Sequence, residues 1–144
     1  MFATFLLLLL TAVSGIKCIA LVQPPVMVVK PGESFSVPCK ITGYSATSTC
    51  TNWIRHKSGQ ALEWIGWYCS SSNTGSIDSL KNKIRFSAEA SSNTVILHGQ
   101  NFQSEDTAVY HCAEWGDGYY NYFDYWGKGT QVTVTSAVQS APKS

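Results

Sequence analysis

The side chains in this sequence best suited to covalent chemistry are five cysteines and three histidines. A cysteine or serine nucleophile needs a base and a group that orients the base, and a zinc site needs ligands at short, regular spacings. The chain carries no HExxH motif, no paired CxxC motif and no glycine-rich phosphate loop. We therefore expect no enzyme activity, no metal and no cofactor, and we expect the cysteines to form disulfides. The residues concerned are Cys18, Cys39, Cys50, Cys69, Cys112, His56, His98 and His111.

Residues 1–18, MFATFLLLLLTAVSGIKC, are typical of a secretory signal peptide. The apolar run from Phe5 to Val13 is too short to span a bilayer, and small residues follow it, so we expect cleavage after Gly15 or after Cys18. A buried N-terminal helix is the alternative. Export places the chain where disulfides persist. Cleavage after Cys18 leaves four cysteines, which allow three pairings, whereas cleavage after Gly15 also leaves Cys18 unpaired.

Short β-strands are expected to position these side chains. Apolar residues alternate with polar ones within residues 35–39, 84–88, 95–97 and 132–134. Turn sequences such as KPGE, KSGQ, SSNTGS and ASSN separate the strands, and only QSEDTA favours a short helical turn. About eight or nine evenly spaced strands predict an all-β fold, an antiparallel β-sandwich. Because Pro38 has no amide hydrogen to donate, we expect a local irregularity in its strand.

The overall charge argues against partners that are themselves strongly charged. The formal net charge is +1 and no run of basic residues occurs, whereas a nucleic-acid-binding protein depends on a basic face. We therefore expect no nucleic-acid partner and no direct contact of this segment with a membrane. Residues 137–144, AVQSAPKS, lose the alternation, so we expect a linker or the start of a following constant domain.

A small set of residues narrows the kind of sandwich. Cys39 and Cys112 lie 73 positions apart, Trp53 lies 14 positions after the first, and Tyr110 precedes the second by two residues in DTAVYHC. Together these residues resemble the immunoglobulin variable domain. The resemblance covers residues 19–136 and implies a Greek-key sandwich with a Cys39–Cys112 disulfide between the sheets, against which Trp53 packs. It also implies that the Tyr110 hydroxyl bonds to the preceding turn.

The segments WIRHKSGQALEWIG and YFDYWGKGTQVTVTS resemble an antibody heavy chain. Light chains and T-cell receptor chains usually carry phenylalanine where Trp126 stands. The resemblance implies that Lys83 pairs with Asp106 beneath the sandwich, so these two residues join Trp53 and Tyr110 in the structural core. We expect a heavy-chain variable domain from a non-mammalian vertebrate, with antigen recognition as its function. The alternative is the variable domain of a T-cell receptor or of an innate immunoglobulin-superfamily receptor.

The family places three binding loops at one end of the sandwich, and they map to GYSATSTCTN, WYCSSSNTGS and AEWGDGYYNYFDY. Tyrosines offer large contact areas at low entropic cost, and Trp115 is either an antigen anchor or a residue packed under the tyrosines. A Cys50–Cys69 disulfide would join the first two loops and make them rigid before binding; free thiols, or pairing with another chain, are the alternatives. The expected antigen-binding residues are Tyr44, Thr49, Trp67, Tyr68, Ser71, Asn73, Trp115, Asp117, Tyr119, Tyr120 and Tyr122.

A second surface is expected to pack on an immunoglobulin light chain. Leu62 and Trp64 are apolar where a single-domain antibody normally has polar substitutions, which favours a paired chain. His56 and His111 are expected to face the partner, either as ordinary hydrogen-bonding groups or as a pH switch. The expected interface comprises Ile54, His56, Leu62, Trp64, His111, Phe123 and Trp126. We expect the antibody to be secreted, or held at the cell surface through a constant region.

Glu114 departs from the family pattern, in which a basic residue often follows Cys-Ala and pairs with the aspartate of the joining segment. Here that aspartate, Asp124, faces another carboxylate. Because like charges repel, we expect the base of the third loop to be splayed. The alternative is two solvated carboxylates that do not influence each other.

Overall fold

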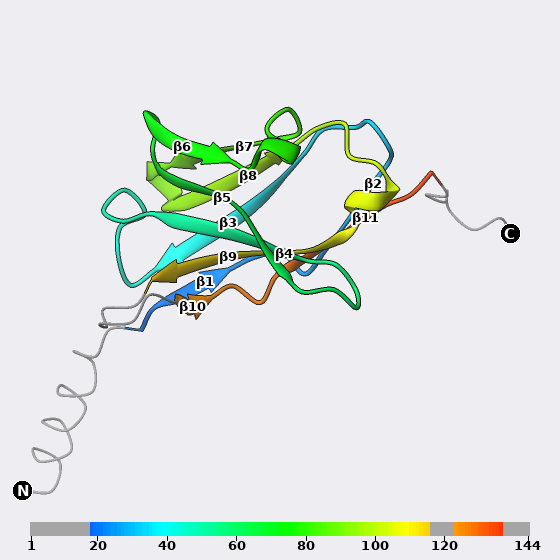
Figure 1. Ribbon diagram of the computed structural model, residues 1–144. Coiled ribbons are helices and arrows are strands. Elements are labelled where there is room, and N and C mark those ends of the chain that lie inside the picture. The colour runs from blue at the N-terminus through cyan, green and yellow to red at the C-terminus, as the bar shows by residue number, and fades with distance from the viewer. Residues whose placement is uncertain (1–17, 116–122, 137–144) are drawn as a thin grey trace, which may run out of the picture.

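The computed structural model describes residues 18–115 and 123–136, which form two β-sheets packed into a sandwich (Figure 1). The first sheet has the order β1-β3-β8-β7, made of Ala20–Val22, Phe35–Thr42, Thr94–Gly99 and Ile84–Glu89. The second sheet has the order β2-β11-β9-β4-β5-β6, made of Val26–Val29, Thr130–Val134, Ala108–Trp115, Thr51–His56, Leu62–Ser70 and Asn73–Ser76. In addition, β10 (Phe123–Trp126) pairs with β9. The predicted β-sandwich is confirmed, and its pairs are antiparallel apart from the parallel pair β2–β11.

The described part of the chain contains eleven strands, more than the eight or nine expected. Pro24 and Pro25 separate β1 from β2, and because proline cannot donate to a ladder, the chain leaves the first sheet there and joins the second. A second break separates β10 from β11, and Gly129 in that break has a φ of 96°, which suits glycine. The first break separates β1 from β2 and the second separates β10 from β11, so each adds one short strand to the expected number.

Alternating side chains of the two sheets fill the space between them. The predicted Cys39–Cys112 disulfide is confirmed: it joins β3 of the first sheet to β9 of the second, with 6.4 Å between the Cα atoms. Trp53 of β4 is fully buried and lies opposite Cys112 in the β4–β9 register. Its indole stacks on Phe86 of β7, with ring centroids 5.7 Å apart. The disulfide and this aromatic pair therefore hold the two sheets together at the centre of the core.

The expectation of an irregularity at Pro38 is wrong, because β3 pairs with β8 in continuous register with Pro38 opposite Ile96. In this register the amide of Ile41 donates to the carbonyl of Asn93. Amides at alternate positions of β3 therefore point toward β8, and the nitrogen of Pro38 points away from it. On the side toward which the Pro38 nitrogen points, β1 pairs only with the last three residues of β3 and does not reach Pro38. No hydrogen bond between β1 and β3 is therefore lost through the missing amide hydrogen.

A network of ion pairs lies at the foot of the sandwich. The Nζ of Lys83 lies 2.7 Å from Oδ2 of Asp106, which is the pair that the resemblance implies. Arg55 was not expected there, but its Nη1 lies 3.6 Å from Oδ1 of Asp106 and its Nε lies 2.6 Å from Oε1 of Glu63. The hydroxyl of Tyr110 donates to the carbonyl oxygen of Asp106 at 2.6 Å, on the turn that the sequence indicated. Buried charge is thus balanced by opposite charge, although Nη1 of Arg55 makes no hydrogen bond to another described residue.

Asp106 and Tyr110 of this network have displaced pKa values. Burial would raise the pKa of Asp106, but the hydrogen bond from the Gln103 amide and the charges of Lys83 and Arg55 outweigh burial and lower that pKa. Burial raises the pKa of Tyr110 to about 12, so its hydroxyl keeps the proton that it donates. Lys83 was expected in the structural core, but its side chain is 24% exposed, so it lies at the rim of the sandwich.

Helical structure in the described residues is confined to three single 3-10 turns. These are η1 (Asp78–Leu80), η2 (Ala90–Ser92) and η3 (Ser104–Asp106). The last one falls in the QSEDTA segment, where a helical turn was expected. Within residues 18–115 and 123–136, no helix has the length and apolar character that crossing a membrane requires.

Candidate binding site

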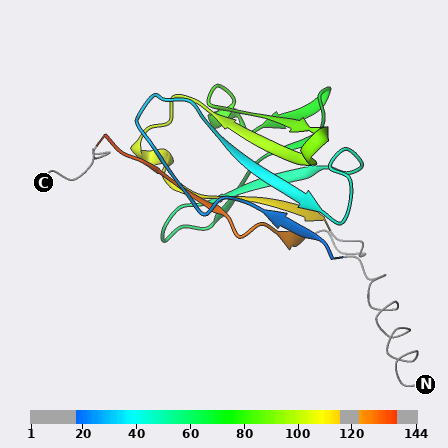
Figure 2. The ribbon, with the colours of Figure 1, turned by 180° about the vertical axis from the view of Figure 1, so that it is seen from behind.

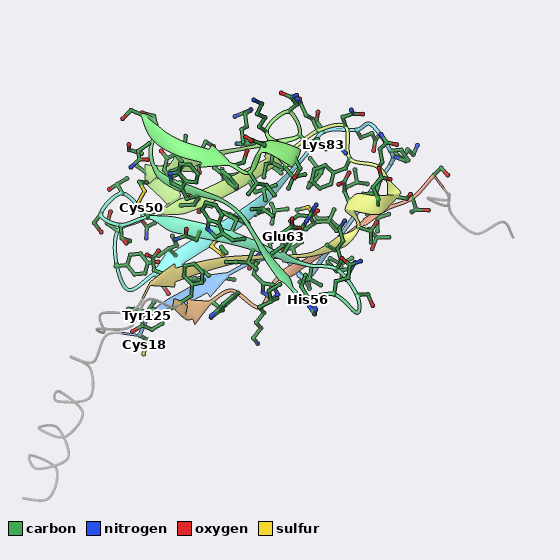
Figure 3. The ribbon with its side chains drawn as sticks, viewed as in Figure 1. Cys18, Cys50, His56, Glu63, Lys83 and Tyr125 are labelled. Atoms are coloured by element: carbon green, nitrogen blue, oxygen red, sulfur yellow. A yellow bond between two sulfur atoms is a disulfide. The ribbon has the colours of Figure 1, made fainter. Side chains whose placement is uncertain are left out.

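Two connections between strands, together with the end of β9 and the start of β10, lie at one end of the sandwich, which we call the loop end. In Figures 1 and 2 the loop from β3 to β4, the turn from β5 to β6, the end of β9 and the start of β10 lie at this end, and β11 leads toward the other end. Figure 3 places Cys50 and Tyr125 at the loop end and Lys83 nearer the opposite end. The fold therefore brings together the first two predicted binding loops and the strands that flank the third.

The structure joins the first and second loops covalently. In the β4–β5 register Thr51 lies opposite Tyr68, which puts the preceding Cys50 beside Cys69. The two cysteines form a disulfide, with 4.1 Å between their Cα atoms. Of the three alternatives that the sequence left open, the structure has the bridge between the two loops. Cys18, by contrast, is exposed and free.

Glu114 lies near the end of β9, and its side chain is buried with 3% exposure. The hydroxyl of Tyr44 donates to its Oε2, and the hydroxyl of Thr49 donates to its Oε1, each at 2.8 Å. The alternative in which this carboxylate is solvated is therefore wrong, because the first loop folds over it. The side chain of Asp124 and all of residues 116–122 lie outside the described residues, so the expected splaying of the third loop stays a prediction.

Asn93 also supports the first loop. This residue ends η2 in the left-handed conformation, with a φ of 53°. Its side-chain amide donates to the carbonyls of Ile41 and Tyr44, at 2.7 and 2.8 Å, and its Oδ1 accepts from the amide of Ala46 at 2.7 Å. Ala46 is 1% exposed, so the middle of the loop is packed against the domain. The first loop thus has a fixed path, which its serine- and threonine-rich sequence did not indicate.

Two tryptophans of β5 form a stacked pair at the second loop. The rings of Trp64 and Trp67 lie 5.6 Å apart with 7° between their planes. Trp64 Nε1 donates to Asn52 Oδ1, and Trp67 Nε1 donates to Asn73 Oδ1, both at 3.0 Å. Gly75 leaves room for the stack, because a Cβ at that position would lie 2.5 Å from the ring of Trp67. Trp64, expected at the light chain, and Trp67, expected at the antigen, are therefore in direct contact.

The expected antigen-binding residues of the second loop differ in their exposure. Ser71 and Asn73 are exposed and Trp67 is half-buried, so all three are accessible. Tyr68 is 8% exposed and belongs to the hydrophobic core, because alternation along β5 turns it inward; its assignment to antigen is wrong. In the third loop, the side chain of Trp115 and the residues Asp117, Tyr119, Tyr120 and Tyr122 lie outside the described residues.

One face of the second sheet carries an apolar patch made of Leu62, Trp64 and Trp126. Their exposures are 57%, 43% and 40%, which is high for side chains of this size. Ile54 lies between them on β4, opposite Trp64 of β5 and opposite His111 of β9. It is only 3% exposed, so it lies beneath the patch and does not form its surface.

The remaining residues expected at the light chain surround this patch. His56 is exposed at the end of β4, and Figure 3 shows it on the side of the molecule away from Cys50. His111 is half-buried: its Nδ1 donates to the Gly127 carbonyl at 2.9 Å, and its ring lies edge-on to Trp126 at 5.8 Å. Phe123 also meets Trp126 edge-on, at 5.7 Å. These contacts fix the orientation of Trp126 at the rim of the patch.

The third histidine lies on the first sheet, away from the apolar patch. His98 is half-buried on β8, where its Nδ1 lies 3.1 Å from Ser36 Oγ and its Nε2 lies 2.7 Å from Ser87 Oγ. Burial, and then the charge of Arg85, lower the pKa of His98. Among the residues that the structure describes, no three His, Cys, Asp or Glu side chains are grouped as a metal site. Four of the described cysteines form two disulfides, and Cys18 is free.

The comparisons with known proteins agree with this geometry. The model of the immunoglobulin V-set domain matches residues 22–135. The chain is 44% identical to the Mus musculus protein named Ig heavy chain V region MOPC 315, over 91% of this chain and 96% of that protein. It is 42% identical to an Ig heavy chain V region of Xenopus laevis, over 75% of this chain and 79% of that protein.

A shark heavy-chain V region is also similar to this chain. An IgW heavy chain V region of Heterodontus francisci is 39% identical, over 84% of this chain and 99% of that protein. Because the relatives come from mammals and from other vertebrates, they do not decide the expected non-mammalian source. The V-set family consists of non-enzymatic domains, and heavy-chain V regions are those with which antibodies recognise antigen. The chain therefore belongs to the immunoglobulin V-set family, as a heavy-chain variable domain.

Proposed function

We propose that this domain recognises antigen as one half of an antibody binding site, in a pair with the variable domain of an immunoglobulin light chain. The observation that supports pairing most directly is the apolar patch of Leu62, Trp64 and Trp126. Removing such side chains from water is favourable by about 25 cal/mol per Å² of apolar area, so burial of the patch stabilises the association with a partner that covers it. Retention of a patch of this kind favours a paired chain over a single-domain antibody.

The position of the patch suits a shared binding site. It lies on β5 and β10, and β5 leads into the second loop while β10 starts within the last residues of the segment mapped to the third. A partner seated on these strands therefore brings its own surface next to the loop end. We assign light-chain contact to His56, Leu62, Trp64, His111, Phe123 and Trp126, with Ile54 beneath them.

Antigen contact is assigned to accessible residues at the loop end. Trp67 offers an aromatic surface, and Ser71 and Asn73 offer polar groups beside it. From the sequence we add five residues of the third loop, in which tyrosines and a tryptophan are suited to recognition: Trp115, Asp117, Tyr119, Tyr120 and Tyr122.

The same proposal includes export of the chain. The apolar leader and two disulfides within the domain both fit an oxidising compartment outside the cytosol. The antibody is then secreted, or held at the cell surface through a constant region that follows residue 136, and this domain needs no membrane contact of its own.

Co-expression with light chains tests the pairing. The domain is produced with a panel of light-chain variable domains, and the mass of the complex is measured by size-exclusion chromatography with light scattering. We expect a one-to-one heterodimer, and we expect Leu62→Glu to weaken it at least about tenfold, because the new carboxylate loses its hydration at the interface.

The matched control is Val28→Glu on β2. Val28 is 57% exposed, the same as Leu62, but it lies on the edge strand of the sheet. We expect this variant to pair normally. The proposal is contradicted if no light chain forms a heterodimer, or if both variants weaken pairing equally.

A further inference from the structure

The first loop is held by residues of two other segments, and one of these residues lies on β9, the strand that leads into the third loop. Asn93 fixes the side of the loop that faces η2, through three hydrogen bonds. Glu114 holds the loop from β9 through the hydroxyls of Tyr44 and Thr49, one residue before that strand ends at Trp115. The conformation of the first loop therefore depends on a residue that the sequence places at the base of the third.

The geometry at Glu114 uses both oxygens of one carboxylate. Tyr44 and Thr49 stand at the two ends of the first loop, five positions apart, and each donates its hydroxyl to a different oxygen at 2.8 Å. Hydrogen bonds to an ionised acceptor are about twice as strong as those between neutral groups. A buried carboxylate also needs such donors, because burying a charge without them is costly. The carboxylate and the two hydroxyls therefore stabilise one another.

The state of Tyr44 fits its role as a donor. Burial, followed by the nearby charge of Glu114 and the hydrogen bond to it, raises the pKa of Tyr44 above its ordinary value. The phenol consequently keeps its proton at any physiological pH. The ring of Tyr44 also packs against the hydrophobic core, so this side chain is anchored at both of its ends.

We propose that Glu114 is a positioning residue of the antigen-binding surface: it fixes the shape of the first loop from the base of the third, and Tyr44 and Thr49 serve as its partners and not as antigen contacts. This inference deepens the proposed function and rests on it for the role of the loops. Together with the Cys50–Cys69 bridge, the link connects all three loop segments before any ligand is present. A surface ordered in advance loses less conformational entropy on binding.

Hydrogen exchange of the unliganded domain, followed by mass spectrometry, tests this inference without an antigen. We expect Glu114→Ala to speed exchange of residues 43–50 by about ten- to hundredfold, the range that corresponds to one hydrogen bond to a charged group. Exchange in β7 and β8 should change far less. Glu114→Gln should restore most of the protection, because its side chain can still bond to both hydroxyls.

Two further variants keep the result interpretable. Tyr44→Phe leaves the carboxylate bonded to Thr49, so the domain should fold and show faster exchange at the Tyr44 end of the loop. Glu33→Ala is the matched control: Glu33 is an exposed glutamate that accepts from the Lys30 amide at 3.1 Å, in the turn between β2 and β3. It should leave residues 43–50 unchanged.

The inference is overturned if Glu114→Ala leaves the first loop as protected as before, or if exchange rises equally in every strand. It is also overturned if Glu114→Gln behaves like Glu114→Ala. These outcomes are separable from those of the light-chain experiment. A domain that pairs but shows no effect of Glu114 refutes only this inference, and a domain that shows the effect but does not pair refutes only the proposed function.

Discussion

Removing the Cys50–Cys69 bridge should cost the domain a defined amount of stability without unfolding it. The perturbation is the double substitution Cys50→Ser and Cys69→Ser. The two cysteines are 19 positions apart, and for a loop of this length the chain-entropy relation gives a stabilisation of about 3 kcal/mol. The same relation gives about 4.4 kcal/mol for Cys39–Cys112, whose separation is 73. The loop bridge is thus the smaller of the two contributions.

The assay is urea denaturation together with thermal unfolding. For a domain of this size a loss of about 3 kcal/mol lowers the Tm by roughly 10–15 °C. The disulfide in the core stays intact, so unfolding should remain cooperative, with hydrogen exchange faster mainly in residues 43–50 and 69–73. Ser71→Ala, an exposed change in the same second loop, is the control and should stay within about 0.5 kcal/mol of the wild type.

Two results would refute the reasoning. A loss below about 1 kcal/mol would mean that the hydrogen bonds of the first loop hold the two loops together without the covalent bond. Loss of cooperative unfolding would mean that the bridge supports the whole sandwich and not only the loop end.

Three other predictions concern the framework. Tyr110→Phe removes a buried hydrogen bond to the carbonyl of Asp106 and should lower the free energy of unfolding by about 1–3 kcal/mol, with an unchanged m-value in urea. Because the pKa of Asp106 is lowered in the fold, its contribution is present above the ordinary aspartate pKa and is lost as the pH falls through the folded value; Asp106→Asn should therefore reduce the loss of stability as the pH falls below about 4. The same substitution leaves the partly exposed Lys83 without its counter-charge and should cost roughly 2–3 kcal/mol at neutral pH, measured by denaturation. The pKa of His98 is lowered by burial and by Arg85, so its neutral form is favoured and the free energy of unfolding should decline as the pH falls below about 6.5. His98→Gln should reduce that decline. An unchanged dependence of stability on pH in this variant would contradict the prediction.

The framework could be predicted from the sequence because its signals are local and periodic. Alternation identified the inward-facing positions of β3, β7, β8 and β11, and the spacing of Cys39, Trp53 and Cys112 carried the resemblance that implied the central disulfide. The irregularity expected at Pro38 does not occur, because the cost of a proline depends on which way its nitrogen points, and that follows from the register of the neighbouring strands.

The loop end was harder to predict because its contacts join segments that are distant in sequence. Glu114 was interpreted through Asp124, its counterpart in the family, whereas it bonds to the first loop about 70 positions earlier. A signal was present: alternation from Tyr110 and Cys112 places Glu114 on the core side of β9, where a carboxylate requires donors. Nothing local identified Tyr44 and Thr49 as those donors.

Register also decided other outcomes that composition suggested wrongly. A tyrosine in a binding loop suits antigen contact, but Tyr68 is the inward residue between Trp67 and Cys69 on β5. Arg55 joined the Asp106 network because β4 pairs it with Glu63 on β5 and with Tyr110 on β9. A residue's type therefore indicated its chemistry, whereas strand pairing determined which partners it meets.

The central claim, that the apolar face of this heavy-chain domain pairs with a light chain beside the loop end, is tested most directly by hydrogen exchange of the domain alone and in complex with a light-chain variable domain. We predict that protection on complex formation concentrates in β5 and β10, around Leu62, Trp64 and Trp126, and leaves β7 and β8 unchanged. Protection on β7 and β8 instead, or none on β5 and β10, would contradict the claim.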